Sequence, residues 1–200
     1  MKIYGDSQSG NCYKIQLVTS FLKIPYDWVE LNIKNGETQT DSFLKLNPNG
    51  KIPILVLDDG KVIAESNAIL HFLAEGSFLL PKDTYLKAKV LEWQFFEQYS
   101  HEPYIAVARF IQHYLGIPEE RREEYNSKQK GGHKALKVME QQLEKTPFFV
   151  GDKITIADIS LFAYTHVADQ GGFDLSNYPH ILSWIKRIQS MELFYPMKFV

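Results

Sequence analysis

The sequence predicts an α/β domain followed by an all-helical domain. In the first 78 residues, short segments of β-type composition alternate with helical ones, which favours a sheet with helices packed on it. After Gly76 and Pro81 the strand signals nearly stop, and long helical patterns take over. This change places the domain boundary within residues 76–84.

The first domain is predicted to run strand, helix, strand, helix, hairpin, helix. The hairpin is the clearest element, because Asp58-Asp59-Gly60 separates the apolar runs 52–57 and 61–64. The other predicted elements are a strand at 3–4, a helix over 13–22 that ends before Pro25, a strand over 26–33, a short helix over 41–46 and a helix over 65–75.

The second domain is predicted to contain four helical segments, over 85–115, 119–144, 155–169 and 178–191. Pro103 predicts a kink in the first of them, and Gly131-Gly132 predicts a bend in the second. Thr155 and Asp158 form a capping box, in which each side chain bonds the other residue's backbone N–H. This cap marks a helix start and by itself indicates no function.

Charge and cysteine content narrow the function classes. The sequence has 22 Lys and Arg against 24 Asp and Glu. It therefore lacks the excess of positive charge that is typical of proteins that bind nucleic acid or an anionic membrane. The single cysteine, Cys12, allows no disulfide framework. No apolar run approaches the ~20 residues of a membrane span, and the N-terminus lacks a signal-peptide core. We expect a cytoplasmic protein without nucleic-acid or membrane partners.

The turn after the first strand carries the first candidate site, with Ser7 and Ser9 next to the start of a helix. Backbone amides and the positive helix pole meet there and stabilise an anion such as a thiolate. A hydroxyl bonded to that thiolate lowers its pKa. The alternative is that these serines only cap the helix. Cys12 is interpreted as a small apolar packing residue.

Two further segments have binding potential. Pro53 opens a strand, and a cis bond after Ile52 would present the backbone of Ile52 to a peptide ligand in strand-like fashion. The alternative is an ordinary edge-strand proline. Glu65 and Ser66 start a helix, where a carboxylate is favoured and Glu65 can accept from an ammonium. An ordinary helix cap explains this pair equally well.

Taken together, these segments resemble the glutathione transferase family over almost the whole chain. Tyr4 to Ile15 resembles the family's first strand, active-site turn and helix, of the serine type found in bacterial members. The other matching segments are Asn47-Pro48-Asn49-Gly50-Lys51-Ile52-Pro53, Glu65-Ser66-Asn67-Ala68-Ile69 and Thr155-Ile156-Ala157-Asp158. The resemblance implies a thioredoxin-like glutathione-binding domain over 1–78 and an all-α domain over 85–200.

The resemblance also implies roles for individual residues. Ser9 and Asn11 would be catalytic, next to the glutathione thiol. The residues that would bind the co-substrate glutathione are Gln39, Lys51, Ile52, Pro53, Glu65 and Ser66. Ile52 would pair through its backbone with the cysteinyl part, Glu65 and Ser66 would hold the γ-glutamyl end, and Lys51 and Gln39 would reach the glycyl carboxylate.

The family places its second substrate in an apolar site between the domains. A kink at Pro103 would turn His101, Tyr104 or Arg109 toward that substrate, although each is equally explained as a solvated or internally bonded side chain. His101 and His113 have the wrong spacing for a metal pair, and we expect no metal.

The function implied is conjugation of glutathione to small hydrophobic electrophiles by a homodimer. Two alternatives remain at this point. One is glutathione-dependent reduction of disulfides or peroxides on the same site. The other is a non-catalytic interaction protein of the same fold, against which the presence of Ser9, Ile52-Pro53 and Glu65-Ser66 argues.

Overall fold

The computed structural model describes residues 1–198 and divides the chain into two compact units. The first comprises residues 1–77 together with the tail from Glu192 on, and the second comprises residues 78–191. The predicted second domain, 85–200, included this tail. In the structure, Tyr13 Oη and Ser20 Oγ on the first helix donate to backbone carbonyls of the tail, at 2.6 and 2.7 Å. The tail therefore belongs with the first unit.

The first unit is built on a four-stranded sheet of order β2-β1-β3-β4. β1 pairs with β2 in parallel and with β3 antiparallel, and β3 pairs with β4 antiparallel. The strands are β1 (Lys2–Gly5), β2 (Asp27–Glu30), β3 (Ile54–Val56) and β4 (Val62–Ala64). The predicted α/β architecture is confirmed. β1 is longer than the predicted strand at 3–4, and the other three strands are shorter than predicted.

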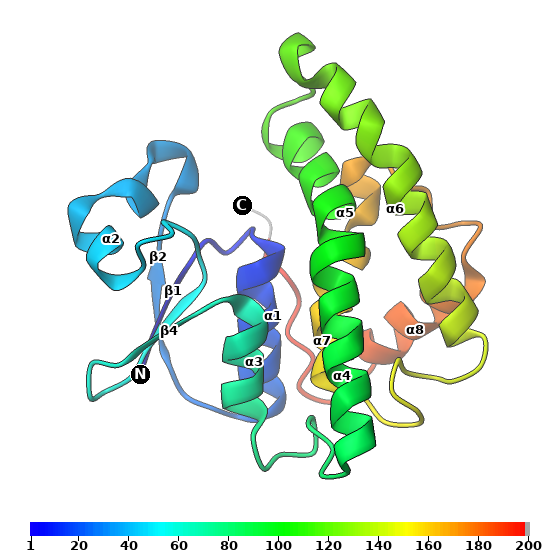
Figure 1. The fold of residues 1–200 in the computed structure, drawn as a ribbon, viewed down its shortest axis with the longest axis horizontal. Coiled ribbons are helices and arrows are strands. Elements are labelled where there is room, and N and C mark those ends of the chain that lie inside the picture. The colour runs from blue at the N-terminus through cyan, green and yellow to red at the C-terminus, as the bar shows by residue number, and fades with distance from the viewer. Residues whose placement is uncertain (199–200) are drawn as a thin grey trace. The chain divides into compact units, whose positions relative to one another are not determined.

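Three helices complete the first unit: α1 (Gly10–Phe21), α2 (Asp41–Leu46) and α3 (Ser66–Ala74). α1 and α3 pack against each other on one face of the sheet, and α2 lies on the other face (Figure 1). Ten of the 12 residues of α1 are buried. A helix enclosed on nearly all sides carries no clear polar stripe, so any polar side chain within it needs an internal partner.

The second unit is entirely helical between residues 78 and 191 apart from its connections. Its α-helices are α4 (Thr84–Phe96), α5 (Glu102–Arg109), α6 (Arg122–Leu143), α7 (Ile156–Thr165) and α8 (Pro179–Gln189). All ten residues of α7 are buried, so this helix forms the centre of the unit. The predicted all-helical composition is confirmed.

The predicted capping box at the start of α7 is present and extends further than the sequence indicated. Asp158 Oδ2 accepts from the backbone N–H of Thr155 at 2.9 Å and from its hydroxyl at 3.2 Å. Asp158 Oδ1 accepts from Phe149 N and from Trp184 Nε1, both at 3.0 Å. One carboxylate therefore joins the start of α7 to the preceding loop and to α8.

The predicted bend at Gly131-Gly132 is wrong, because α6 runs without interruption from Arg122 to Leu143. A Cβ atom at Gly131 would lie 2.2 Å from the Tyr104 ring, and one at Gly132 would lie 2.2 Å from the Phe173 ring. The two glycines let aromatic rings approach the backbone of α6, which compensates for their low helix propensity.

The predicted helix over 85–115 is continuous but not uniform. Two π-helical segments, Glu97–His101 and Phe110–Tyr114, flank α5. Pro103 occupies the first turn of α5, where its missing N–H is tolerated. The winding changes at residues 97–101, immediately before the turn that contains Pro103.

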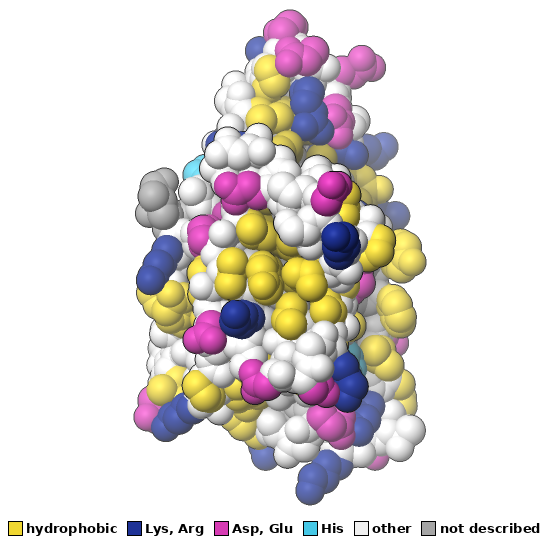
Figure 2. Space-filling model, turned by 90° about the vertical axis from the view of Figure 1, so that its left-hand side faces the viewer, with side chains coloured by type: hydrophobic (Ala, Val, Ile, Leu, Met, Phe, Trp, Pro, Cys, Tyr) yellow, Lys and Arg dark blue, Asp and Glu magenta, His cyan; other side chains and the backbone are white. Residues whose placement is uncertain are grey.

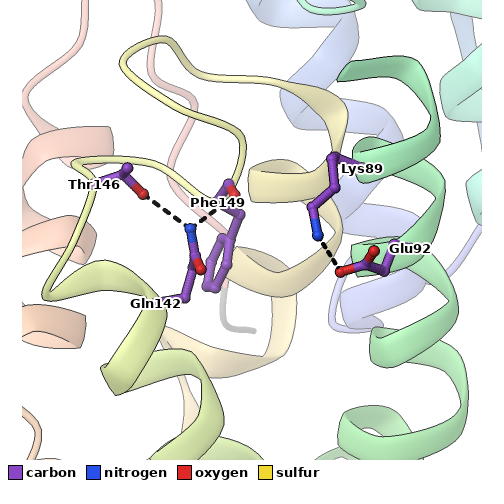
Figure 3. A network of polar contacts seen from close by, with 5 residues as sticks. All are labelled: Lys89, Glu92, Gln142, Thr146 and Phe149. Carbon is purple, nitrogen blue, oxygen red and sulfur yellow. Dashed lines mark hydrogen bonds and ion pairs between the residues drawn. The ribbon is translucent and has the colours of Figure 1, made fainter. Parts of the chain in front are cut away.

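Polar contacts fix the loop that follows α6. Gln142 Nε2 donates to Thr146 Oγ1 at 3.1 Å and to the carbonyl of Phe149 at 3.4 Å (Figure 3). On α4, Lys89 and Glu92 form an ion pair one turn apart. A surface pair at this spacing contributes only about 0.2–0.5 kcal/mol.

Charges are interspersed on the molecular surface that Figure 2 presents. Lys and Arg side chains alternate there with Asp and Glu around a central group of apolar side chains. This distribution agrees with the nearly balanced charge of the sequence.

Candidate functional site

The sheet register brings the predicted site segments to one end of the sheet. Tyr4 pairs with Ile54, and Ile54 pairs with Ala64. The end of β1, the start of β3 and the end of β4 are therefore neighbours. The segments attached at those points are the Ser9 turn, Ile52-Pro53 and Glu65-Ser66.

Ser9 is the N-cap of α1, as one of the two interpretations predicted. Its Oγ accepts from the backbone N–H of Cys12 at 3.5 Å, and Tyr13 N bonds the Ser9 carbonyl at 2.9 Å. A serine hydroxyl that accepts one bond still has its own hydrogen to donate. Capping and contact with a thiolate are therefore compatible roles for Ser9, which is only partly buried.

Glu30 anchors the turn that carries Ser9. Its Oε1 accepts from the backbone N–H and the hydroxyl of Ser7, at 2.8 and 3.1 Å, and its Oε2 accepts from Trp28 Nε1. Asp6 Oδ1 adds a bond from Gln8 N at 2.8 Å. Sequence reasoning missed Glu30, which becomes visible only when the parallel pairing of β1 and β2 places their ends together.

Cys12 is fully buried, which agrees with its interpretation as a packing residue. Burial raises the pKa of its thiol to about 12, although the bond from Ser9 opposes the shift. A thiol in this state is almost entirely protonated near neutral pH and is a poor nucleophile. Any thiolate chemistry at this site therefore belongs to a bound ligand.

A chain of hydrogen bonds connects α1 with the start of α3. Lys14 Nζ donates to Ser66 Oγ at 3.3 Å, and Ser66 Oγ donates to Asn11 Oδ1 at 3.2 Å. Lys14 is fully buried and Ser66 is 6% exposed. Sequence reasoning missed Lys14, although a lysine inside the apolar helical run 13–22 was an available signal.

The peptide bond between Ile52 and Pro53 is cis, in agreement with the first of the two interpretations and with the family resemblance. Ile52 precedes the paired part of β3, whose ladders begin at Ile54. Glu65, at the end of β4, has φ 69° and ψ 117°, an uncommon conformation for a residue with a side chain. Such backbone strain concentrates at functional sites. The Glu65 side chain is exposed.

Gln39 and Lys51, the two residues predicted to contact the glycyl carboxylate, are both connected to the loop before β3. Gln39 Nε2 donates to the carbonyl of Gly50 at 3.1 Å. Asn47 Nδ2 donates to the carbonyl of Lys51 at 2.7 Å and so holds the backbone of this loop. The side chains of Gln39 and Lys51 are both exposed.

The three predicted substrate contacts occupy different environments in the second unit. His101 is fully buried and its Nε2 lies 2.9 Å from Thr165 Oγ1. Arg109 is 2% exposed, and its Nε donates to Gln170 Oε1 at 2.8 Å. Contacts inside the helical unit thus account for both. Tyr104 instead lines a hollow of about 130 Å³ between α6 and the segment from Phe96 to Tyr104.

Residues 1–198 contain no cluster of three or more His, Cys, Asp or Glu side chains that could hold a metal ion. In the same range, no helix is long and apolar enough to cross a membrane.

Comparison with known proteins assigns both units to families. Residues 8–75 match the glutathione S-transferase N-terminal domain, and residues 93–192 match the glutathione S-transferase C-terminal domain. A curated relative, the disulfide-bond oxidoreductase YfcG of Escherichia coli, is 28% identical over 187 residues, covering 90% of this chain and 86% of the relative.

Solved structures agree with this assignment. A glutathione S-transferase from Pseudomonas fluorescens is 62% identical with a TM-score of 0.97, and 98% of each chain is covered. A maleylacetoacetate isomerase from Methylobacterium extorquens AM1, solved with bound malonate and glutathione, is 25% identical with a TM-score of 0.81, covering 96% of this chain and 94% of that one. The chain described here belongs to the glutathione S-transferase family.

Proposed function

We propose that this protein binds glutathione on its first unit, stabilises the glutathione thiolate and conjugates it to small hydrophobic electrophiles. The observation that carries the proposal is the meeting of Ser9, Asn11 and Ser66 at one end of the sheet, where two helices begin. Glutathione bound to a relative with a TM-score of 0.81 supports the choice of ligand.

Each part of glutathione has a matching group on this surface. The first amides of α3 and the Ser66 hydroxyl suit the γ-glutamyl carboxylate, and the exposed Glu65 suits the adjacent ammonium. Ile52, outside the strand ladders, would pair through its backbone with the cysteinyl part. Lys51 and Gln39, both exposed, would contact the glycyl carboxylate.

Ser9 is the proposed activating group. A thiol has an ordinary pKa of about 8.5, so a decrease of one unit raises its thiolate fraction at neutral pH several-fold. The Ser9 hydroxyl hydrogen and the first amides of α1 would supply that decrease by bonding to the charged form. Asn11, two residues further on, would contribute a second polar contact near the sulfur.

Tyr104 is the proposed contact for the electrophile. The hollow that it lines, of about 130 Å³, is close to the size of an engineered cavity that binds benzene. We expect Tyr104→Ala to raise KM for an aromatic electrophile and to leave glutathione affinity unchanged. Tyr85→Ala is the matched control, because Tyr85 is 70% exposed on the same helical stretch. Equal kinetics for the two variants would exclude Tyr104.

The decisive experiment is calorimetric titration of reduced glutathione into the wild type and a Glu65→Ala/Ser66→Ala variant. A Glu75→Ala/Ser77→Ala variant is the control, because it removes the same residue types at the other end of α3. Binding to the wild type and the control, with loss in the first variant, would support the proposal. Absence of binding to wild-type protein would refute it and favour the non-catalytic alternative.

A second candidate activity is glutathione-dependent disulfide reduction, which the similarity to the disulfide-bond oxidoreductase favours. In this reaction one glutathione thiolate attacks a disulfide and releases a thiol, and a second glutathione resolves the mixed disulfide as glutathione disulfide. Product analysis separates the two activities, because conjugation yields a thioether and no glutathione disulfide. Ser9→Ala and Asn11→Ala should slow whichever reaction the protein catalyses.

We also propose a homodimer. Large apolar side chains are exposed along α4 and the π-helical segment that follows it, with Leu91 41%, Phe95 60% and Tyr99 75% exposed. Exposed apolar side chains of this size mark interaction surfaces when they adjoin one another. Sedimentation should give twice the chain mass, and Phe95→Asp should shift the protein toward the monomer. A wild type that sediments as a monomer would contradict this.

A further inference from the structure

Lys14 is a cation in the interior of the first unit. It lies on α1 one turn after Asn11, and its side chain is fully buried. Removing a lysine ammonium from water is costly unless bonds to its three hydrogens compensate. One of these bonds goes to the hydroxyl of Ser66 on α3, at 3.3 Å. An apolar residue would fill the same space in α1 without the cost of removing an ammonium from water.

The bond from Lys14 determines where the Ser66 hydrogen points. An ammonium group only donates, so Ser66 Oγ is the acceptor in that contact. The hydroxyl hydrogen is then directed elsewhere, and Asn11 Oδ1 lies 3.2 Å from Ser66 Oγ. Lys14 therefore donates to Ser66, and Ser66 donates to Asn11. It links the start of α3 to the first turn of α1.

We infer that Lys14 is a positioning residue for an anionic ligand group at Ser66, and that it couples this group to Asn11. The inference rests on the proposed function, in which the ligand group is the γ-glutamyl carboxylate. Lys14 adds buried positive charge behind the start of α3 and keeps the Ser66 hydroxyl available as a donor.

Binding of a carboxylate would change the hydrogen-bond chain in a defined way. An ionised acceptor forms a stronger bond than the neutral Asn11 amide, so the Ser66 hydrogen would turn from Asn11 to the carboxylate. The Asn11 side chain would lose this donor and reorient toward the thiol side of the ligand. Binding of the γ-glutamyl carboxylate would thereby free the Asn11 side chain to contact the thiol.

The test compares two ligands that differ in one group. Glutathione carries the γ-glutamyl carboxylate, and 4-aminobutanoyl-cysteinylglycine lacks only that group. The wild type should prefer glutathione, and Lys14→Met should reduce this preference about tenfold or more, since bonds to charged groups contribute about that much. Affinity for the decarboxylated analogue should stay within about twofold. Gln16→Met, which also replaces a buried polar residue of α1, should keep the wild-type preference.

A second readout separates positioning from packing. In the wild type, the measured pKa of the bound thiol should be lower for glutathione than for the analogue, and in Lys14→Met the two values should coincide. Thiolate absorption as a function of pH measures both. If Lys14→Met does not fold, Lys14→Gln, which keeps a donor without the charge, should show the same loss of preference.

Three results would overturn the inference. An unchanged preference for glutathione in the Lys14 variant would show that the charge does not act on the carboxylate. An equal loss of affinity for both ligands would assign Lys14 a packing role. Absence of glutathione binding to the wild type would instead refute the proposed function, and the inference with it, so the two failures are distinguishable.

Discussion

Replacing Asp158 by asparagine tests how the helical unit is held together. The side chain is fully buried, and four donors from Thr155, Phe149 and Trp184 converge on its two oxygens. Asparagine has nearly the same shape and keeps one oxygen for Phe149 N and Trp184 Nε1. Its amide nitrogen would then face the N–H and hydroxyl of Thr155. The hydroxyl can turn and accept from the amide, but the Thr155 N–H would lose its acceptor, and the remaining bonds would no longer be to a charged group.

The expected cost follows from the lost N–H bond and from the loss of the charge. A buried donor without an acceptor costs about 1–3 kcal/mol, and a hydrogen bond to a charged group contributes about 1 kcal/mol more than a neutral one. Asp158→Asn should therefore reduce the free energy of unfolding by about 2–5 kcal/mol. For a chain of 200 residues, Tm changes by about 2–4 °C for each kcal/mol, which gives a decrease of roughly 4–20 °C. Urea denaturation at pH 7 measures the free energy, and a thermal scan measures Tm.

Asp152→Asn is the matched control, because Asp152 is exposed six residues before Asp158. Its free energy of unfolding should remain within about 0.5 kcal/mol of wild type. A decrease below about 1 kcal/mol for Asp158→Asn would refute the reasoning. That result would mean that the four contacts to Asp158 are not coupled to global unfolding.

The pH dependence of the same variant has a defined sign. Burial raises the pKa of Asp158 from its ordinary 3.8 to about 6, against the opposing effect of its donors. A raised carboxyl pKa gives stability that is complete below pH 3.8 and is lost as the pH rises through 6. The wild type should therefore exceed Asp158→Asn by about 1 kcal/mol more at pH 5 than at pH 7. A difference that shrinks at pH 5 would contradict this.

Three further predictions concern single side chains. Gly132→Ala should lose about 1–3 kcal/mol of stability, because its Cβ would lie 2.2 Å from the Phe173 ring and this outweighs the gain in helix propensity. An increase in the free energy of unfolding, measured by urea denaturation, would contradict the close packing. Cys12, buried with a pKa of about 12, should resist alkylation at pH 8 in native protein and react fully in urea, as mass spectrometry would show. Glu140→Gln should cost about 1 kcal/mol, because both carboxylate oxygens cap backbone N–H groups at the start of α8, each at 2.9 Å; an unchanged Tm would show that water replaces them.

Most of the fold could be predicted because its turns and helix caps depend on short stretches of sequence. The hairpin around Asp58-Asp59-Gly60 and the cap at Thr155 each depend on a few neighbouring residues, and both are present. The bend at Gly131-Gly132 failed for the opposite reason. Whether a glycine bends a helix or admits a ring depends on what lies across from it, and Tyr104 and Phe173 are distant in sequence.

In the candidate site, too, features that depend on neighbouring residues were predicted, and features that depend on distant residues were missed. Ser9 as a cap and the cis bond before Pro53 follow from short motifs. Glu30 and Lys14 were missed, since an acidic residue at the end of a strand and a lysine in a helix are usually solvated. Only the pairing of β1 with β2 and the packing of α1 on α3 bring these two charges to the site.

Two charged side chains, one buried and one exposed, suggest a common physical design for the first unit. Lys14 contacts Ser66 from within the unit, and Glu30 holds Ser7 and Trp28 from the solvent side. Neither residue needs to touch a ligand. Lys14 fixes Ser66, a proposed ligand contact, and Glu30 fixes the turn that carries Ser9, another one. Fixed donors lose less entropy on binding than mobile ones. Glu30→Gln should therefore weaken thiol activation by Ser9 while Lys14→Met weakens carboxylate binding. Measuring the bound-thiol pKa and the ligand preference in both variants tests whether the two supports act independently, and a double variant whose effects do not add would show that they are coupled.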